Sequence, residues 1–238
     1  MKPWISWMSV FILVTALFPA GSNAFAAEED DAFRHVKRSD PWVEYVVEGE
    51  ARVFEGTYHY RVKDEEKILA EGWGTASEGG PEWGSFKQTI QIPTCKAALK
   101  ETLQLELFER SAKDGSEVHR LTIPLRAGDV AEKNDAFRKI QIQEPQVKYP
   151  VGGEARVFEA NYHYVVSDGH YELVEGHGTA STGAPDWGVF QETIVVPLKR
   201  VPINGALVLE LYELDGKNGQ RSRFHYVLLD QTPWPECK

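Results

Sequence analysis

Cysteine is scarce in this chain of 238 residues, which contains only Cys95 and Cys237. Two cysteines so far apart lack the close spacing of metal-binding motifs, so the sequence predicts no metal site. The matching positions of the internal repeat described below are Lys199 and Lys133, so neither thiol belongs to a shared core. An intramolecular disulfide that ties the C-terminal tail to the first half of the chain is one interpretation. Two unpaired thiols and an intermolecular bridge are the alternatives.

Basic residues are also few. The chain has 26 Lys and Arg against 36 Asp and Glu, a net charge of −10. Loss of an N-terminal leader that contains Lys2 leaves 25 against 36, a net charge of −11. Nucleic acids and anionic membrane surfaces are bound through a basic face. The composition therefore argues against both as the main partner.

Motifs of catalysis and cofactor binding are missing. The sequence has no G-x-S-x-G nucleophile elbow, H-E-x-x-H motif, P-loop or G-x-G-x-x-G fingerprint. Arg52 and Glu55 recur as Arg156 and Glu159. A general base needs a second group and a cleft, so we interpret these charges as structural. We therefore expect no enzyme activity and no cofactor.

A long apolar run occurs only at the N-terminus. It extends from about Trp4 to Phe18, follows Lys2 and precedes the small-residue site Ala24-Phe25-Ala26. This order is typical of a secretory signal peptide, which we predict at residues 1–26. An uncleaved anchor is the alternative and the only membrane contact that the sequence predicts, although the run is short for a span. We expect a secreted protein or one located in the cell envelope.

The chain does contain a long duplication. Residues 49–90 return as residues 153–194, a shift of 104 (153 minus 49) without insertion or deletion. GEARVFEGTYHYRV becomes GEARVFEANYHYVV, with 11 of 14 positions identical, and EGWGTASEGGPEWGSFKQTI becomes EGHGTASTGAPDWGVFQETI, with 13 of 20. The register extends outward, because Asp31 to Arg34 returns as Asp135 to Arg138. The chain therefore consists largely of two copies of one unit.

These copies, residues 31–134 and 135–238, are predicted to be two tandem domains. Each is 104 residues long (134 minus 30), which is a normal domain size and large enough for a core of its own. We therefore expect a fragment of residues 31–134 to fold alone and cooperatively.

Alternation of apolar and polar residues predicts strands throughout both copies. Over residues 51–62, Phe54 and Tyr58 fall on one face, which we take as the core face, and His59 falls on the other. Turn residues such as Asp114 and Gly115 separate six or seven short strands in each copy. No segment longer than about ten residues has a helical apolar period. The predicted fold class is all-β, with two tandem β-sandwich domains.

Three motifs give the chain a family resemblance. The strand GEARVFEGTYHYRV, the loop EGWGTASEGGPEWGSF and the strand LQLELFE before a D-G turn resemble the immunoglobulin-like domain of bacterial spore germination proteins, the second of the germination-associated Gmad domains. The resemblance covers about Pro41 to Leu125 and Pro145 to Leu229. It implies immunoglobulin-like sandwiches, an exported or envelope protein of a spore-forming Gram-positive bacterium, and no catalytic residues.

The loop of the second motif is the best candidate for a binding site. It places Glu82 beside Trp83 in one copy and Asp186 beside Trp187 in the other. An exposed Trp would stack on a sugar ring while the carboxylate accepts hydroxyl donors. The alternative, favoured by the usual burial of Trp, is that both rings turn inward and plug the sandwich.

Two histidines, His59 and His163, also match between the copies and form a second, weaker candidate site. Both are predicted in the middle of a strand on its polar face. The ordinary interpretation is a solvated or hydrogen-bonded strand residue rather than a ligand.

Together these features predict an exported, non-enzymatic tandem immunoglobulin-like binding or scaffolding protein of the bacterial cell or spore envelope. The family resemblance suggests a link to sporulation or germination. An envelope protein or a wall polysaccharide is the expected partner. A secreted protease inhibitor that presents a sandwich loop is the alternative, since one fold can carry many functions.

Overall fold

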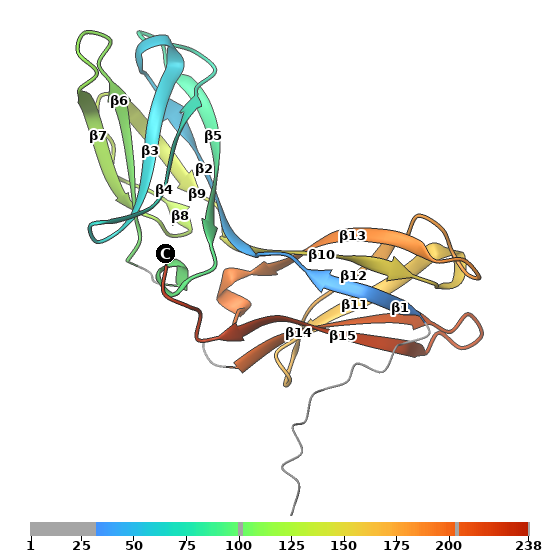
Figure 1. Cartoon of the computed structure of the whole chain (residues 1–238). Coiled ribbons are helices and arrows are strands. Elements are labelled where there is room, and N and C mark those ends of the chain that lie inside the picture. Colours follow the sequence, from blue (N-terminus) through green and yellow to red (C-terminus); the bar gives the residue numbers. More distant parts are fainter. Residues whose placement is uncertain (1–31, 100–101, 203–204, 238) are drawn as a thin grey trace, which may run out of the picture.

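The computed structural model describes residues 32–99, 102–202 and 205–237. The predicted signal peptide, residues 1–26, lies outside them. Figure 1 shows two β-sandwiches set at an angle and joined by long strands. Within the described residues there is no α-helix, and the only helical segments are the short 3₁₀ turns η1 (Phe54–Gly56), η2 (Lys96–Leu99), η3 (Phe158–Ala160) and η4 (Leu198–Arg200). The all-β prediction is confirmed.

The first sandwich has a four-stranded antiparallel sheet in the order β4-β3-β6-β7. Its strands are β3 (Thr57–Asp64), β4 (Lys67–Thr75), β6 (Gln104–Arg110) and β7 (Glu117–Pro124). The facing layer contains β2 (Trp42–Ala51), β5 (Gly84–Pro93), β8 (Gly128–Asp129) and β9 (Phe137–Ile142).

The second sandwich repeats this plan with the order β12-β11-β14-β15. Its strands are β11 (Asn161–Ser167), β12 (Glu172–Thr179), β14 (Gly205–Leu214) and β15 (Arg221–Thr232). The facing layer contains β1 (Phe33–Arg38), β10 (Gln146–Ala155) and β13 (Gly188–Pro197). The two facing layers merge into one seven-stranded sheet, in which β10 lies between β1 and β2 along its path.

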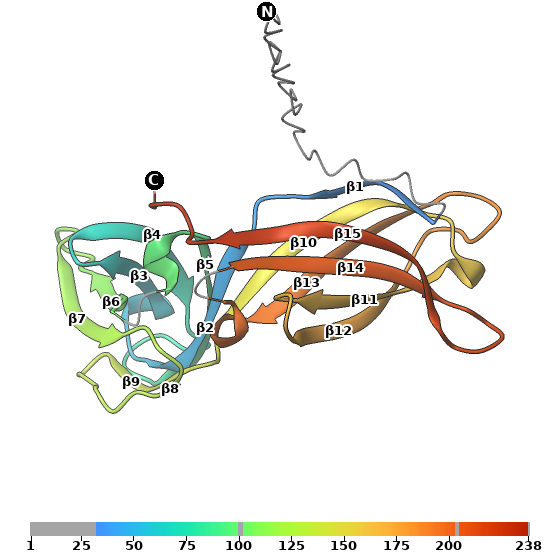
Figure 2. The ribbon, with the colours of Figure 1, turned by 90° about the horizontal axis from the view of Figure 1, so that it is seen from below.

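The first strand of each repeat belongs to the sandwich of the other repeat. β1 pairs antiparallel with β10, with Phe33 opposite Ala155. Reciprocally, β9 pairs antiparallel with β2, with Phe137 opposite Ala51. Figure 2 shows β1 lying along the second sandwich. The predicted domain limits, at residue 134, therefore separate the sequence repeats but not the two sandwiches.

A pseudo-two-fold axis relates the two halves of the molecule. Where the sandwiches meet, β2 pairs directly with β10, and Val43 lies opposite Val147. These are equivalent residues of the two repeats (147 minus 104 is 43), as expected of strands that pair across a two-fold axis. The chain thus has the architecture of a strand-exchanged dimer whose two subunits are covalently fused.

The short linker before β2 explains the exchange. Ile142 of β9 lies opposite Val47, and its counterpart in the first repeat is Arg38, four residues before Trp42 (42 minus 38). To pair in the same register with its own β2, Arg38 would lie beside Val47, which is about 16 Å from Trp42 along a strand. Four residues of chain span at most about 14 Å. Residues 39–41 therefore cannot form the required hairpin, and β1 extends into the other sandwich instead.

Each exchanged strand contributes a phenylalanine to the core that it joins. Phe33 is fully buried and contacts the rings of Tyr162 and Phe190 edge-on, at centroid distances of 6.1 and 6.4 Å. Phe137 is equally buried and contacts Tyr58 at 6.3 Å. The sequence shared by Asp31 to Arg34 and Asp135 to Arg138 is therefore the anchor of the exchange.

The predicted core face is wrong at Phe54. This side chain is 57% exposed, whereas the adjacent Val53 is buried. The 3₁₀ turn η1 interrupts the strand, and Glu55 within it has the left-handed φ of 52°. An irregularity of this kind reverses which side chains point inward on its two sides. Tyr58, which follows the turn, is buried as predicted.

A disulfide connects the two sandwiches at the junction. The Sγ atoms of Cys95, after β5, and Cys237, after β15, are bonded at 2.08 Å. The backbone N–H of Lys96 donates to the carbonyl oxygen of Pro235 at 2.8 Å, and its Nζ lies 2.6 Å from a carboxylate oxygen of Glu236. The C-terminal tail is thereby attached to the first sandwich, which is the pairing that the sequence left open.

Candidate functional site

The two Trp loops, residues 76–83 and 180–187, connect the two sheets of each sandwich. The indole of each loop contacts two arginines. The guanidinium carbon of Arg138 is 3.9 Å from the ring centroid of Trp83, and that of Arg52 is 4.8 Å away. Arg34 and Arg156 lie at 4.1 and 4.7 Å from Trp187 in the second sandwich. Both indoles are half-buried. These are cation–π contacts, which are strongest with Trp.

One arginine of each pair comes from an exchanged strand and is also held by a carboxylate. Arg138 of β9 donates from Nε to Glu50 at 2.7 Å, and Lys139 donates to the same carboxylate at 2.8 Å. Both hydrogen bonds, that of Lys139 foremost, lower the pKa of Glu50. In the second sandwich Arg34 of β1 donates to Glu154 at 2.5 Å. This bond lowers the pKa of Glu154, and a weaker contribution comes from His35.

These contacts give the Trp loops a structural task that the sequence did not suggest. The rings are neither fully buried plugs nor open platforms, because arginines lie over them. Glu82 and Asp186, the neighbouring carboxylates, are exposed. Each loop therefore holds the strand that arrives from the other repeat, while the acidic side chain beside its Trp is presented to solvent.

The matched histidines lie on the outer faces of the four-stranded sheets. His59 stacks on Phe108 at 5.6 Å, and His163 stacks on Tyr212 at 5.7 Å. Partial burial is the main cause that lowers the pKa of both imidazoles, and His177 adds to the effect on His163. The neutral rings are thus favoured. Among the described residues, no group of three or more His, Cys, Asp or Glu side chains is placed to hold a metal ion.

A cleft of about 770 Å³ lies where the two sandwiches meet. Trp42, Leu69 and Ile92 supply apolar surface, and Arg38 and Asp230 supply charge. Clefts with this mixed lining at a domain junction are common binding sites. Sequence analysis missed it because strand exchange and the disulfide bring its walls together from segments far apart in the chain. The position of both cysteines outside the shared core was the one signal in the sequence that pointed there.

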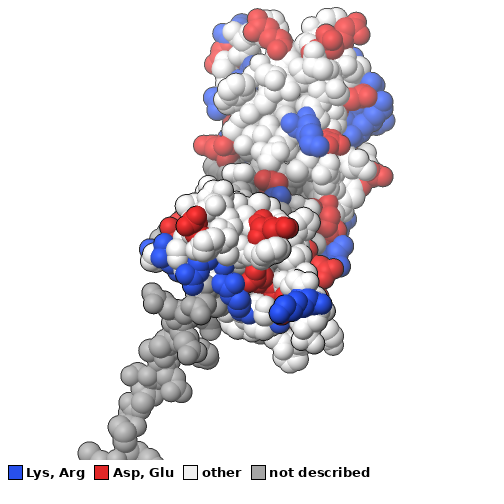
Figure 3. All heavy atoms as spheres, turned by 90° about the vertical axis from the view of Figure 1, so that its right-hand side faces the viewer, with Lys and Arg blue, Asp and Glu red and all other residues white. Residues whose placement is uncertain are grey.

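The described surface offers no broad basic field on the side shown in Figure 3, where Lys and Arg alternate with Asp and Glu. Among the described residues, no helix has the length and apolar character needed to span a bilayer.

The two sandwiches, each with an exchanged strand, define a tandem immunoglobulin-like module. Residues 40–116 and 140–220 match the family model described as the immunoglobulin-like domain of bacterial spore germination, Gmad2. Because these stretches cover more than half of the chain, the chain belongs to this family. Both copies are matched, which confirms the tandem arrangement and the family resemblance seen in the sequence.

Among solved structures, human GIVD cytosolic phospholipase A2 aligns with 82% of this chain, at 9% sequence identity and a TM-score of 0.26. The aligned part is 27% of that protein, and a likeness of this size carries no argument about fold or function. No match is found among curated proteins.

Proposed function

We propose that this protein is an exported, non-enzymatic module that binds or scaffolds at the bacterial cell or spore envelope, with a role in sporulation or germination. The observation that carries the proposal is the presence of two germination-type immunoglobulin-like domains in one chain. The family is generally non-catalytic. The partner is an envelope protein or a wall polysaccharide.

A rigid scaffold is supported by the way in which the sandwiches are joined. The reciprocal strands, the direct pairing of β2 with β10 and the disulfide each cross the junction. Surfaces on the two sandwiches are therefore held at a fixed spacing and angle. A fixed spacing favours simultaneous engagement of two sites on an extended partner, because the second contact becomes intramolecular.

Three surfaces are the candidates for partner contact: the Trp loops, the sheet faces that carry the matched histidines, and the cleft. One variant for each surface separates them. The Trp-loop variant replaces Glu82 and Asp186 by Ala, which leaves the arginine-stacked rings in place. The sheet-face variant replaces His59 and His163 by Ala. The cleft variant replaces the exposed Arg38 by Ala.

The test is co-sedimentation of the intact protein and these variants with purified peptidoglycan, in parallel with a binding assay on purified envelope proteins. We expect the wild type to bind in one of the two assays and one variant class to lose that binding at unchanged melting temperature. Binding in neither assay would contradict the proposal. Release of soluble fragments from the peptidoglycan would contradict its non-enzymatic part.

Location is tested separately by fractionation of sporulating cells with an antibody against the protein. We expect the protein outside the cytoplasmic membrane and shortened by about the length of a signal peptide. Recovery of the full-length chain from the cytoplasm would contradict export. Inhibition of an extracellular protease by the purified protein would instead support the alternative function.

A further inference from the structure

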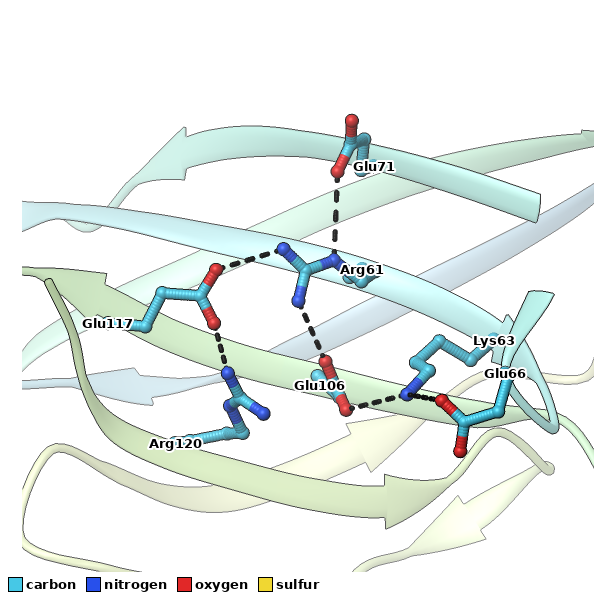
Figure 4. A network of polar contacts seen from close by, with 7 residues as sticks. All are labelled: Arg61, Lys63, Glu66, Glu71, Glu106, Glu117 and Arg120. Atoms are coloured by element: carbon cyan, nitrogen blue, oxygen red, sulfur yellow. Dashed lines mark hydrogen bonds and ion pairs between the residues drawn. The ribbon is translucent and has the colours of Figure 1, made fainter. Parts of the chain in front are cut away.

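The outer faces of the two four-stranded sheets differ, although the repeats share one register. In the first sandwich a network of ion pairs covers this face (Figure 4). Arg61 lies at its centre, 3.1 Å from a carboxylate oxygen of Glu106 and 2.9 Å from one of Glu117. Arg120 on β7 is paired with Glu117 as well. This face is charged from one strand to the next.

In the second sandwich the ion pairs on this face are those of Arg221, at the start of β15, with Glu172 and Glu210, and the edge of the sheet beyond them is apolar. Arg120 of β7 is replaced by Phe224 (120 plus 104). Together with Tyr226 and Leu228 it forms a stripe along the outer face of β15, and the three side chains are 39%, 61% and 54% exposed. The rings of Phe224 and Tyr226 stack at 6.4 Å with an interplanar angle of 16°. A continuous exposed apolar stripe on a folded protein marks an interaction surface.

The strand that carries the stripe is also the edge strand of its sheet, and its register against β14 shifts between Leu207 and Val208 and between Leu211 and Glu213. β15 has 12 residues and pairs with β14 on one side, and no described strand pairs with its other side. Its counterpart β7 has only 8 residues and carries Arg120 and Thr122 before its last residue, Pro124. Short length, charge and proline are the usual devices that prevent an edge strand from pairing with another chain. At the three matching positions β15 carries the apolar stripe instead.

We propose that β15 pairs antiparallel with β15 of a second copy of this chain, about a two-fold axis at Tyr226. In this arrangement Phe224 of each copy lies opposite Leu228 of the other, and the two Tyr226 side chains face each other. Cross-strand aromatic and aliphatic pairs stabilise such a sheet. Because both copies use the same surface, the contact closes as a dimer.

Two observations favour a second copy over a strand of unrelated sequence. Tyr226 is flanked on both sides by an apolar side chain, Phe224 and Leu228, so an antiparallel second copy places apolar residues opposite each other along the whole stripe. The chain also contains this kind of contact already, because β2 and β10 pair antiparallel with the equivalent residues Val43 and Val147 opposite each other. The inference rests on the geometry of β15 and is independent of the partner proposed above.

Sedimentation equilibrium of the intact protein tests the dimer. We expect the average mass of the wild type to rise with concentration toward twice the monomer mass. Tyr226→Lys places two positive charges on the axis and is expected to weaken association by about 100-fold or more. The matched control is Thr122→Lys on β7, which should leave association unchanged. Both positions are exposed, so thermal melting should show that both variants remain folded.

Disulfide trapping tests the register. Under mild oxidation, Tyr226→Cys should form a covalent dimer, since this residue meets itself on the axis. Phe224→Cys should form one only when combined with Leu228→Cys. A monomer at every concentration, or a dimer that Tyr226→Lys leaves intact, would overturn the proposal. Covalent dimers from Phe224→Cys alone would overturn the register and with it the proposed axis.

Discussion

Two fragments of equal length whose ends differ by nine residues should differ in whether the first sandwich folds. A fragment of residues 31–134 corresponds to the sequence repeat but lacks β9. A fragment of residues 40–143 lacks β1, which belongs to the other sandwich, and retains β9. We expect the second fragment to fold and the first to be unfolded or only marginally stable. Both fragments carry Cys95→Ser, so that no free thiol complicates the comparison.

The size of the effect follows from what β9 buries. Phe137, Ile140 and Ile142 are at most 2% exposed. Burial of a Phe or Ile side chain contributes about 1.5–3 kcal/mol, so the three together contribute about 5–9 kcal/mol. The whole stability of a domain is only about 5–15 kcal/mol. β1 cannot take the place of β9, because residues 39–41 are too short to return it to the required register.

Far-UV circular dichroism and urea denaturation of the two fragments measure the difference. A cooperative transition is expected for residues 40–143, and addition of a synthetic peptide of residues 135–143 should restore one to residues 31–134. If residues 31–134 alone are as stable as residues 40–143, β1 has folded back onto its own β2. That result would refute the linker argument and the obligatory exchange.

Four further predictions concern single contacts. Phe33→Ala should lower the free energy of unfolding by about 3–5 kcal/mol, as for other buried Phe residues, whereas the exposed Phe54→Ala should cost less than about 1 kcal/mol in the same denaturation assay. Trp83→Ala removes two cation–π contacts and should cost about 1–2 kcal/mol; no loss would show that the arginines do not hold the ring. The lowered pKa of Glu50 means that its contribution to stability is complete above about pH 4.5 and is lost as pH falls below that value; melting curves of Glu50→Gln should depend less on pH in that range than those of the wild type. The disulfide of Cys237 predicts no reaction with a thiol reagent after unfolding without reductant, and its reduction should cost about 2–5 kcal/mol; two reactive thiols would contradict it.

Several properties of this protein could be predicted from the sequence because they depend on local patterns. Alternation of apolar and polar residues placed Tyr58 and His59 on opposite faces of one strand. The duplicated text fixed the tandem arrangement, and the motifs identified the family. The absence of cysteine from the shared core directed attention to Cys95 and Cys237 as a pair. None of these inferences requires knowledge of which distant strands lie together.

The tertiary structure alone decided how the repeats are combined. Alternation identifies a strand but not its neighbour, so β1 could not be assigned to the second sandwich until the reach of its linker was compared with the pairing register. The arginine contacts of the Trp loops could not be predicted for the same reason. One of the two arginines that cover each of Trp83 and Trp187 comes from the other repeat. At Phe54 the backbone itself departs from the pattern, because a left-handed residue reverses the faces. Strand partners depend on contacts between residues far apart in the chain, and the two repeats carry the same anchor sequence, which fits either sandwich equally well.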